Sequence, residues 1–355
     1  MGTTYTKMKI FHYPDKLKSI MDKTITAPIH LRIKPTNVCN HNCKYCAYRT
    51  NNLQVGKDMI IKDYIPESKM MEIIDDITEI GVKAVTFSGG GEPLLYPFML
   101  NTLKKISKTS IKFSVLTNGS KLINEIAEVL ANHGTWIRIS IDGWDDESYS
   151  FYRGVPKGEF TKILKNIEHF KKIKGKCLVG VVIIVDKTNH SHIYDLIKTL
   201  KNVGVNSIKI SPCLISNDTN ENNNYHESIF TSVKEQINKS VNELKDANFE
   251  IFDSYNIQLE TTFKKNYTWC PYIQILHVIG ADQNIYTCQD KAYNLERGLI
   301  GSIKNTRYKD FWLINKNNCL DINPAIHCLH HCVSNEKNKI VLEYFEAKNN
   351  HLEFV

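Results

Sequence analysis

The sequence has no apolar run long enough to span a bilayer, and its opening MGTTYTKMKIFHYPDK lacks the apolar segment of a secretory signal peptide. It also lacks a long Lys/Arg block with interleaved aromatics, so its net charge of +7 does not indicate a nucleic-acid partner. These absences predict a cytoplasmic protein without a membrane partner, whose ten cysteines are reduced rather than paired in disulfides. Clustered cysteines in that setting indicate metal or redox chemistry.

Strand-like and helix-like patterns alternate along the first two thirds of the chain, and 42% of the 355 residues are hydrophobic. The predicted strands are 30–34, 82–88, 111–117, 136–142, 177–185 and 207–215. Because several of them are apolar on both faces, they favour a parallel sheet covered by helices. Six such units predict an α/β fold, a partial (β/α)6 TIM-like barrel, with its chemistry at the carboxyl ends of the strands.

Changes in composition and in the expected secondary structure divide the chain into five parts. We expect an N-terminal extension at 1–29, the barrel core at 30–215, and an Asn-rich linker and helix at 216–267. A small cysteine-rich α+β module is expected at 268–335, and a C-terminal tail at 336–355.

Three cysteines follow the first predicted strand closely, in KPTNVCNHNCKYCAYRT. Zinc is one interpretation of Cys39, Cys43 and Cys46, but a structural zinc site takes four ligands, and His41 lies inside the first gap, where reaching the same ion would strain the loop. A [4Fe–4S] cluster on three thiolates leaves one iron with open positions, which is a catalytic feature.

The spacing Cys39-x3-Cys43-x2-Cys46, with Tyr45 before the last cysteine, resembles the signature loop of the radical S-adenosylmethionine (SAM) superfamily. In that family the open iron binds the amino and carboxylate groups of SAM. An electron from the reduced cluster then cleaves SAM to a 5′-deoxyadenosyl radical. The family fold is a partial (β/α)6 barrel, which agrees with the six units counted above. The resemblance implies that these three cysteines hold the cluster and that Tyr45 lies in the cofactor site.

The stretch SGGGEP, directly after the second predicted strand, matches a second motif of that family. Alone it could be an ordinary strand-to-helix turn, because glycine permits positive φ and proline limits the conformations of the chain. The resemblance implies instead that Gly89, Gly90, Gly91 and Glu92 bind the SAM amino group.

Weaker matches lie at the ends of the next strands. The resemblance implies SAM contacts from Asn118 in LTNGS, from Ser140 and Asp142 in ISIDG, and a SAM carboxylate contact from Arg153 in SFYRG. A guanidinium suits that task because it can bind a carboxylate with two parallel hydrogen bonds. The alternatives are an ordinary turn at Asn118 and a surface charge at Arg153.

Five of the ten cysteines lie in the last quarter of the chain, which favours ligation over buried free thiols or a structural zinc site. A hairpin-like stretch between two cysteines, followed by a late pair, resembles the SPASM or twitch auxiliary modules of radical SAM enzymes. The resemblance implies a second [4Fe–4S] cluster on Cys270, Cys288, Cys328 and Cys332. Cys319 is then spare or replaces one of the late pair, and His327, His330 and His331 are possible substitute ligands.

The two other cysteines differ in position. Cys177 begins the fifth predicted strand, at the edge away from the chemistry, and we interpret it as structural. Cys213 follows the sixth, where a buried apolar role competes with a sharper hypothesis. In that hypothesis Cys213, or else Cys319, donates a hydrogen atom to a substrate radical and so catalyses epimerisation.

The expected reaction is hydrogen abstraction from a substrate C–H bond, followed by oxidation or epimerisation with help from the auxiliary cluster. Only 29 residues precede the first strand, too few for a separate leader-binding domain, so we expect a small sugar- or nucleotide-like substrate. The expected electron donor is a flavodoxin or a ferredoxin. A peptide maturase and a non-enzymatic zinc-binding protein are the alternatives.

Overall fold

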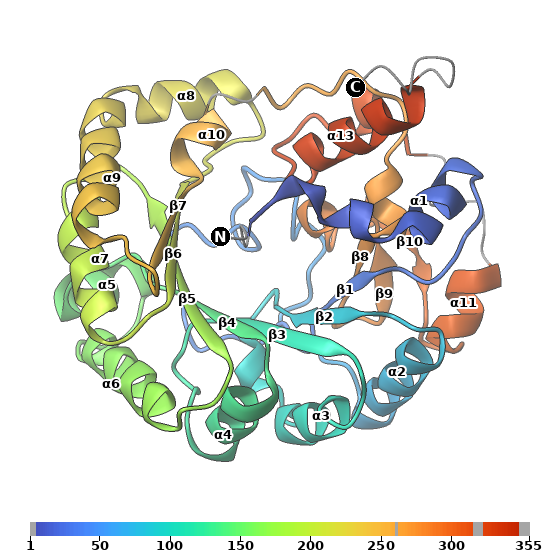
Figure 1. Cartoon of the computed structure of the whole chain (residues 1–355), viewed down its shortest axis with the longest axis horizontal. Coiled ribbons are helices and arrows are strands. Elements are labelled where there is room, and N and C mark those ends of the chain that lie inside the picture. The colour runs from blue at the N-terminus through green and yellow to red at the C-terminus, as the bar shows by residue number, and fades with distance from the viewer. Residues whose placement is uncertain (1–4, 260–261, 315–321, 348–355) are drawn as a thin grey trace.

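One continuous sheet organises the computed structural model, which describes residues 5–259, 262–314 and 322–347. Its ten strands run in the order β10-β9-β8-β1-β2-β3-β4-β5-β6-β7 (Figure 1). They are β1 (His30–Ile33), β2 (Ala84–Phe87), β3 (Lys112–Thr117), β4 (Trp136–Ser140), β5 (Leu178–Val185), β6 (Ser207–Pro212), β7 (Glu250–Asp253), β8 (Leu276–Ile279), β9 (Asn284–Tyr286) and β10 (Leu299–Ser302). Strands β1 to β7 pair in parallel, so their carboxyl ends meet at one edge.

Helices follow each of the first six strands and cover the outside of the curved sheet (Figure 1). These are α2 (Glu67–Glu79), α3 (Met99–Ile106), α4 (Asn124–His133), α5 (Asp146–Arg153), α6 (Glu159–Lys172), α7 (Ile193–Asn202), α8 (Thr219–Glu227) and α9 (Phe230–Leu244). The remaining helices are η1 (Lys7–His12), α1 (Pro14–Met21), η2 (Pro93–Leu95), α10 (Tyr255–Leu259), η3 (Pro271–Gln274), η4 (Gln289–Lys291), α11 (Tyr308–Ile314), α12 (Pro324–His327) and α13 (Asn335–Glu346). No helix within the described ranges is long and apolar enough to cross a membrane.

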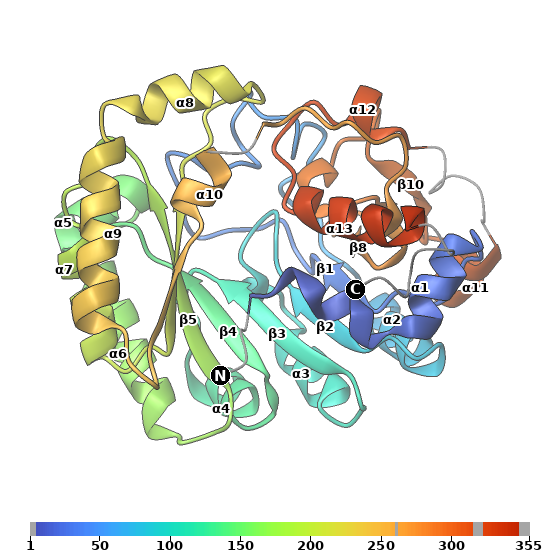
Figure 2. The same cartoon turned by 45° about the horizontal axis from the view of Figure 1, so that its top comes forward.

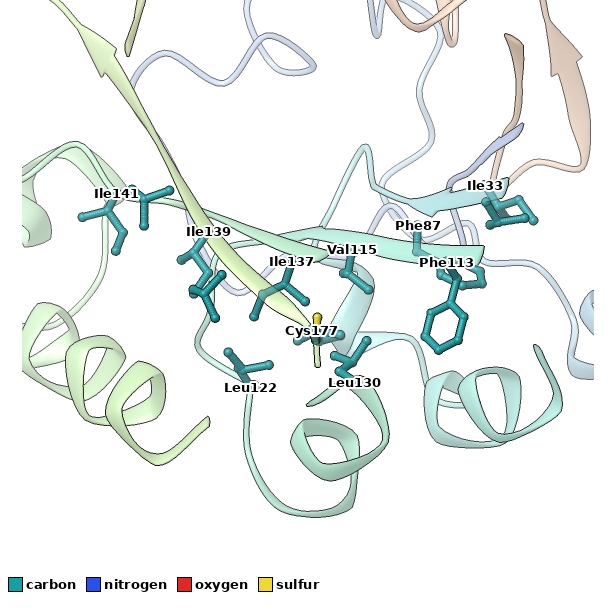
Figure 3. Close-up of a cluster of buried hydrophobic side chains, with 14 of the residues drawn as sticks. Ile33, Phe87, Phe113, Val115, Leu122, Leu130, Ile137, Ile139, Ile141 and Cys177 are labelled. Carbon is teal, nitrogen blue, oxygen red and sulfur yellow. The ribbon is translucent and has the colours of Figure 1, made fainter. Parts of the chain in front are cut away.

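The two faces of the sheet differ sharply in polarity. Side chains of alternate residues point outward and pack against the helices, as Ile33, Phe87, Val115 and Ile137 do in Figure 3. The residues between them point inward and are largely polar. Figure 3 also shows Cys177 in this outer core near Leu130, and burial raises the pKa of its thiol to about 12. The structure therefore agrees with a structural role for Cys177.

The partial barrel and its six strand–helix units are confirmed, and the fold adds a seventh parallel strand, β7, within the segment that we expected to be linker and helix. The Asn-rich part of that segment is itself helical, as α8. Asp218 caps this helix by accepting from the Glu221 amide at 3.0 Å. The buried Asn222 donates to the Ser216 carbonyl at 2.8 Å and accepts from the Ile215 amide at 2.9 Å. Its composition is typical of a loop, but these bonds to the backbone stabilise a helix.

The C-terminal cysteine-rich module is not a separate sheet. Its strand β8 pairs in parallel with β1, and β9 and β10 continue from β8 as antiparallel strands. Helix α13 lies beside η1 on the same side of the molecule (Figures 1 and 2). The module and the barrel therefore share one hydrogen-bonded framework, and the domain boundaries stay predictions.

A histidine is buried where the module meets the barrel. His277, on β8, is fully buried and stacks on Trp312 with ring centroids 4.0 Å apart. Its Nδ1 donates to the Ile273 carbonyl at 3.3 Å, which leaves Nε2 to accept from the Tyr308 hydroxyl at 3.0 Å. Burial lowers the pKa of His277 to about 3, because a charged imidazolium would lose its water there.

This histidine should make the stability of the protein depend on pH. Its folded pKa lies below its unfolded value, so its contribution is complete above about pH 6.5 and is lost as the pH falls toward 3. Between pH 7 and pH 5 the loss should be about 2 kcal/mol. We expect His277→Gln to remove that part of the pH dependence of urea unfolding. His169→Gln, on the exposed face of α6, should leave this pH dependence unchanged. If the free energy of unfolding changes equally with pH in the wild type and in His277→Gln, the assignment is wrong.

Candidate active site

The three-cysteine loop leaves the carboxyl end of β1 and is held by backbone bonds from two directions. The Asn42 amide donates to the Arg153 carbonyl at 2.8 Å, and the Lys44 amide donates to the Tyr152 carbonyl at 3.0 Å. From the other side, the Glu92 amide donates to the Val38 carbonyl at 2.9 Å. The loop is therefore positioned by the end of α5 and by the SGGGEP stretch.

Each of the three thiols of this loop lies near an N–H donor. The His41 amide lies 3.4 Å from Cys39 Sγ, and Arg153 Nη1 lies 3.5 Å from Cys43 Sγ. Burial raises the pKa of the Cys46 thiol, and the Tyr48 backbone amide acts in the opposite direction. Burial also raises the pKa of Cys39, to about 11. Donors aimed at sulfur would stabilise thiolates, the form that binds a metal.

A buried ion pair lies beneath this loop. The fully buried Asp142 carboxylate accepts from Arg153 Nη2 and from the Tyr45 hydroxyl through one oxygen. Its other oxygen accepts from the Ile184 amide at 2.6 Å. Burial acts to lower the pKa of the Arg153 guanidinium, but Asp142 raises it well above its usual range. The structure thus joins Tyr45, Asp142 and Arg153 in one cluster, in which Arg153 already has a carboxylate partner.

The three glycines of SGGGEP are required by close packing rather than by positive φ. A Cβ on Gly91 would lie 2.1 Å from the Val38 carbonyl oxygen of the cysteine loop. A Cβ on Gly89 would collide with the Gly91 backbone, and one on Gly90 would collide with the Asn37 and Met59 side chains. Gly91 is therefore the position at which a side chain would displace the cysteine loop.

Glu92 binds protein donors with both of its carboxylate oxygens. Oε1 accepts from the Leu94 amide at 2.9 Å and from Thr117 Oγ1 at 2.7 Å, and Oε2 accepts from the Asn118 amide at 2.6 Å. Burial raises the pKa of the carboxyl, and these donors oppose the shift. Glu92 therefore ties the end of β2 to the end of β3.

The polar residues expected at the ends of β3 and β4 have different surroundings. Asn118 donates to Asn40 Oδ1 at 2.9 Å and accepts from Ser120 Oγ at 2.7 Å, which joins β3 to the cysteine loop. Ser140 is half-buried on the inner face at the end of β4. The sequence reasoning missed Asn40 and Ser120, although both flank motifs that it used.

The four module cysteines expected to bind a second cluster line one cavity, together with Lys265, Thr287 and His330. Asn338 Nδ2 donates to Cys270 Sγ at 3.3 Å. Burial raises the pKa of Cys270 to about 12 and of Cys288 and Cys332 as well, and the negative charges of neighbouring thiolates add to each shift. Lys265 is buried there and donates to the Phe263 and His330 carbonyls. Cys270, Cys288, Cys328 and Cys332 are thus brought together.

A buried lysine connects the two cysteine groups. Lys34, at the end of β1, donates to the Tyr48 hydroxyl at 2.6 Å and to Gln289 Oε1 at 3.2 Å. Tyr48 follows Cys46 by two residues, and Gln289 directly follows Cys288. Lys34 Nζ also lies 3.4 Å from the Gly89 carbonyl oxygen. Nothing in the sequence pattern indicated this role, since Lys34 looked like the end of a strand.

Of the two cysteines predicted as hydrogen-atom donors, the structure describes one. Cys213 is buried just after β6, at the carboxyl edge, and burial raises the pKa of its thiol to about 12. Its carbonyl lies 2.9 Å from His226 Nε2. Cys319 lies outside the described residues.

Several buried polar atoms near the two cysteine groups lack a protein partner. In the described part of the chain these include Ser88 Oγ, Asn37 Oδ1 and Arg153 Nε around the loop, and Thr287 Oγ1 and both His330 ring nitrogens in the module cavity. Nowhere in the described ranges do three His, Cys, Asp or Glu side chains gather closely enough for one metal ion. Three cysteines on one loop and four around one cavity are a donor set that [4Fe–4S] clusters take.

Comparison with known families matches residues 33–200 to the Radical SAM superfamily. Residues 33–200 of this chain are therefore similar to the radical SAM superfamily. The cofactors of that family are a [4Fe–4S] cluster and SAM, and the cysteine-rich module at the end of this chain lies outside the matched residues.

Individual relatives differ in how much of the chain they share. An S-adenosylmethionine-dependent nucleotide dehydratase of Lacinutrix mariniflava is 32% identical over 31% of this chain and 22% of its own length. A cysteine-type anaerobic sulfatase-maturating enzyme of Clostridium novyi is 25% identical over 81% of this chain and 80% of its own length. Several further relatives are matched over about half of their own length or less.

The fold has a close counterpart among solved structures. Streptococcus suis SuiB bound to the precursor peptide SuiA superimposes with a TM-score of 0.61, at 16% identity, over 88% of this chain and 71% of SuiB. At this identity the likeness concerns the fold alone. It confirms the partial barrel with its C-terminal appendage.

Packing at Gly91 should decide whether the cysteine loop can hold a [4Fe–4S] cluster. In Gly91→Ala the new methyl group would collide with the Val38 backbone and displace the loop that carries Cys39. After anaerobic reconstitution we expect about four fewer irons per chain, the content of one [4Fe–4S] cluster. Gly158→Ala is the control, since its Cβ meets no atom within 4 Å, although a φ of +95° strains it. Full iron content in Gly91→Ala would show that this contact does not position the loop.

Proposed function

We propose that this chain cleaves SAM reductively and oxidises a small polar substrate at a C–H bond, with an auxiliary cluster as the electron acceptor. The observation that carries the proposal is the pair of cysteine groups on one sheet, linked through Lys34 between Tyr48 and Gln289. Two redox sites at one barrel mouth suit a substrate that lies between them.

In this proposal Cys39, Cys43 and Cys46 hold the SAM-binding cluster, and Cys270, Cys288, Cys328 and Cys332 hold the auxiliary one. Reduced by a flavodoxin or a ferredoxin, the first cluster would supply one electron for cleavage of SAM to methionine and a 5′-deoxyadenosyl radical, which would remove a hydrogen atom from the substrate. The second would supply an acceptor for the electron that the substrate gives up with a proton, so that the substrate would lose two electrons in all.

The protein's own groups prepare this site. The Asp142 carboxylate holds Arg153, whose Nη1 lies 3.5 Å from Cys43 Sγ and whose Nε is buried without a partner. A buried cation with a free donor beside the first cysteine group suits an anionic ligand such as the SAM carboxylate. Ser88 Oγ, also buried and without a partner, is a further candidate SAM contact beside Gly89 and Gly90. The tightly packed glycines keep this wall rigid.

A peptide substrate is the second candidate, favoured by one observation. A sulfatase-maturating enzyme is matched along 80% of its length, whereas the nucleotide dehydratase is matched over 22% of its length. A maturase would place one residue of an extended peptide at the barrel mouth.

The cluster assignment can be tested by metal and product analysis. After anaerobic reconstitution with SAM and a strong reductant, we expect about eight irons per chain and 5′-deoxyadenosine. Cys43→Ala should lose about four irons and all SAM cleavage, whereas Cys270→Ala should lose about four irons through the other site.

Cys177→Ala provides the matched control, because this cysteine lies in the outer core. It should keep both its iron and its SAM cleavage. Zinc in place of iron, with no 5′-deoxyadenosine, would overturn the proposal. Roughly four irons with SAM cleavage would keep the enzyme and remove the auxiliary cluster.

If the reaction is an epimerisation, we propose that Cys213 donates a hydrogen atom to the substrate radical. A hydrogen-atom donor must stay protonated, and burial keeps the Cys213 thiol protonated at neutral pH by raising its pKa to about 12. In D2O, where the thiol carries deuterium, an epimerised product should gain one deuterium from the wild type and none from Cys213→Ala, which should also stall turnover. Equal deuterium in both products would exclude Cys213 as the donor.

A further inference from the structure

Three basic side chains point into the barrel from different strands. Leu31 and Ile33 of β1 are buried in the outer core, so Arg32 between them faces inward. The same alternation turns Arg138 inward on β4 and Lys209 inward on β6. Because β1, β4 and β6 occupy different positions around the curved sheet, these cations converge on the lumen.

None of these cations forms an ion pair with another described residue, although each is half-buried. Within the described ranges Arg32 Nε is buried and has no hydrogen-bond partner. Among the described residues Arg138 donates to the Tyr5 hydroxyl, and it lies over the Trp136 and Tyr5 rings. A half-buried cation that lacks an ion-pair partner is costly, so an anion that reached these groups would be stabilised.

The electrostatics of Lys209 show that the cations act on one another. Burial lowers the pKa of Lys209 to about 8, and Arg138, Arg32 and Lys337 of α13 lower it further by repulsion. Asp290, beside Cys288, is the carboxylate that opposes this effect, and its Oδ2 already accepts from the Val333 amide at 2.9 Å. Three cations and one carboxylate act on Lys209, so the charge around this lysine is positive.

We propose that this lumen binds a phosphoryl or pyrophosphoryl group at the end of a small-molecule substrate, held by Arg32, Arg138 and Lys209. The inference rests on the proposed function, because it names the substrate class of the same site. Such a group would anchor the far end of the substrate and leave its C–H bond toward the cysteine loop.

A compact, multiply charged anion explains the arrangement better than the alternatives do. Peptide carboxylates carry one charge each and lie several ångströms apart along a chain, whereas these cations converge on one space. The iron–sulfur clusters are also anionic, and Cys288 is among the groups that attract Arg32, but no cysteine is among those that act on Lys209 or Arg138. Guanidinium groups suit phosphoryl oxygens in particular, because they can bind two at once.

The test is calorimetric titration of the reconstituted holoprotein with inorganic pyrophosphate. We expect saturable binding that weakens as salt is raised. Lys209→Gln and Arg138→Gln should each weaken it by about tenfold or more, the usual effect of losing one charge-assisted hydrogen bond. Arg138→Lys should recover part of the loss. Lys172→Gln, which removes the same charge at the exposed end of α6, should have no effect.

SAM cleavage is measured on the same wild-type preparation, so that the two proposals fail separately. Cleavage without pyrophosphate binding, or binding that both lumen variants retain in full, would overturn the phosphoryl site and leave the proposed function standing. Pyrophosphate binding without SAM cleavage would overturn the proposed function instead. Charge-dependent binding of an acidic peptide, with none of pyrophosphate, would favour the peptide maturase.

Discussion

The burial of Lys34 is the constraint on which the rest of the active region depends. Placing an ammonium group out of water costs several kcal/mol unless its protons are bound. Here burial lowers the pKa of Lys34 well below its usual range, and its donors reach Tyr48, Gln289 and the Gly89 carbonyl. These acceptors come from three separate segments, so the lysine is satisfied only when all three are in place. The cysteine loop, the glycine motif and the module thus share one buried polar contact.

Around this contact, backbone packing and buried charge have complementary roles. The glycines let the SGGGEP stretch lie directly against the cysteine loop, at distances that any Cβ would prevent. The Asp142–Arg153 pair supplies the charge beneath the same loop, where low polarity strengthens its effect on Cys43. The loop is therefore in contact with the buried ion pair through Cys43 and with the glycine motif through Val38.

The alternation of residues along the strands explains how one sheet serves two purposes. Apolar residues at every second position bury against the helices and form the core seen in Figure 3. The residues between them project inward, and there the sheet carries Thr86, Ser114 and the lumen cations. His30 Nε2 and Thr86 Oγ1 are 2.8 Å apart, and Thr86 Oγ1 lies 2.8 Å from Ser114 Oγ, so polar contacts cross three strands. The core and the polar interior are thus two faces of the same strands.

Local pattern predicted much of this molecule. Strand and helix periods are local properties, so the six strand–helix units could be predicted within a few residues. The Cys39, Cys43 and Cys46 spacing could also be read directly, because its ligands are neighbours in sequence. Helix α8 and strand β7 could not, since the bonds of Asn222 to the backbone and the pairing of β7 with β6 depend on partners elsewhere.

Contacts between distant segments were decided only by the tertiary structure. Lys34 and Gln289 are 255 residues apart, and Arg153 meets Cys43 across 110 residues. No periodicity of the sequence encodes such pairs, because they arise from strand order and from the closing of the sheet. The sequence by itself therefore determined the fold class and the cysteine motifs. Tertiary packing decided which charges are buried together, and hence how Lys34 joins the cysteine loop to the C-terminal module.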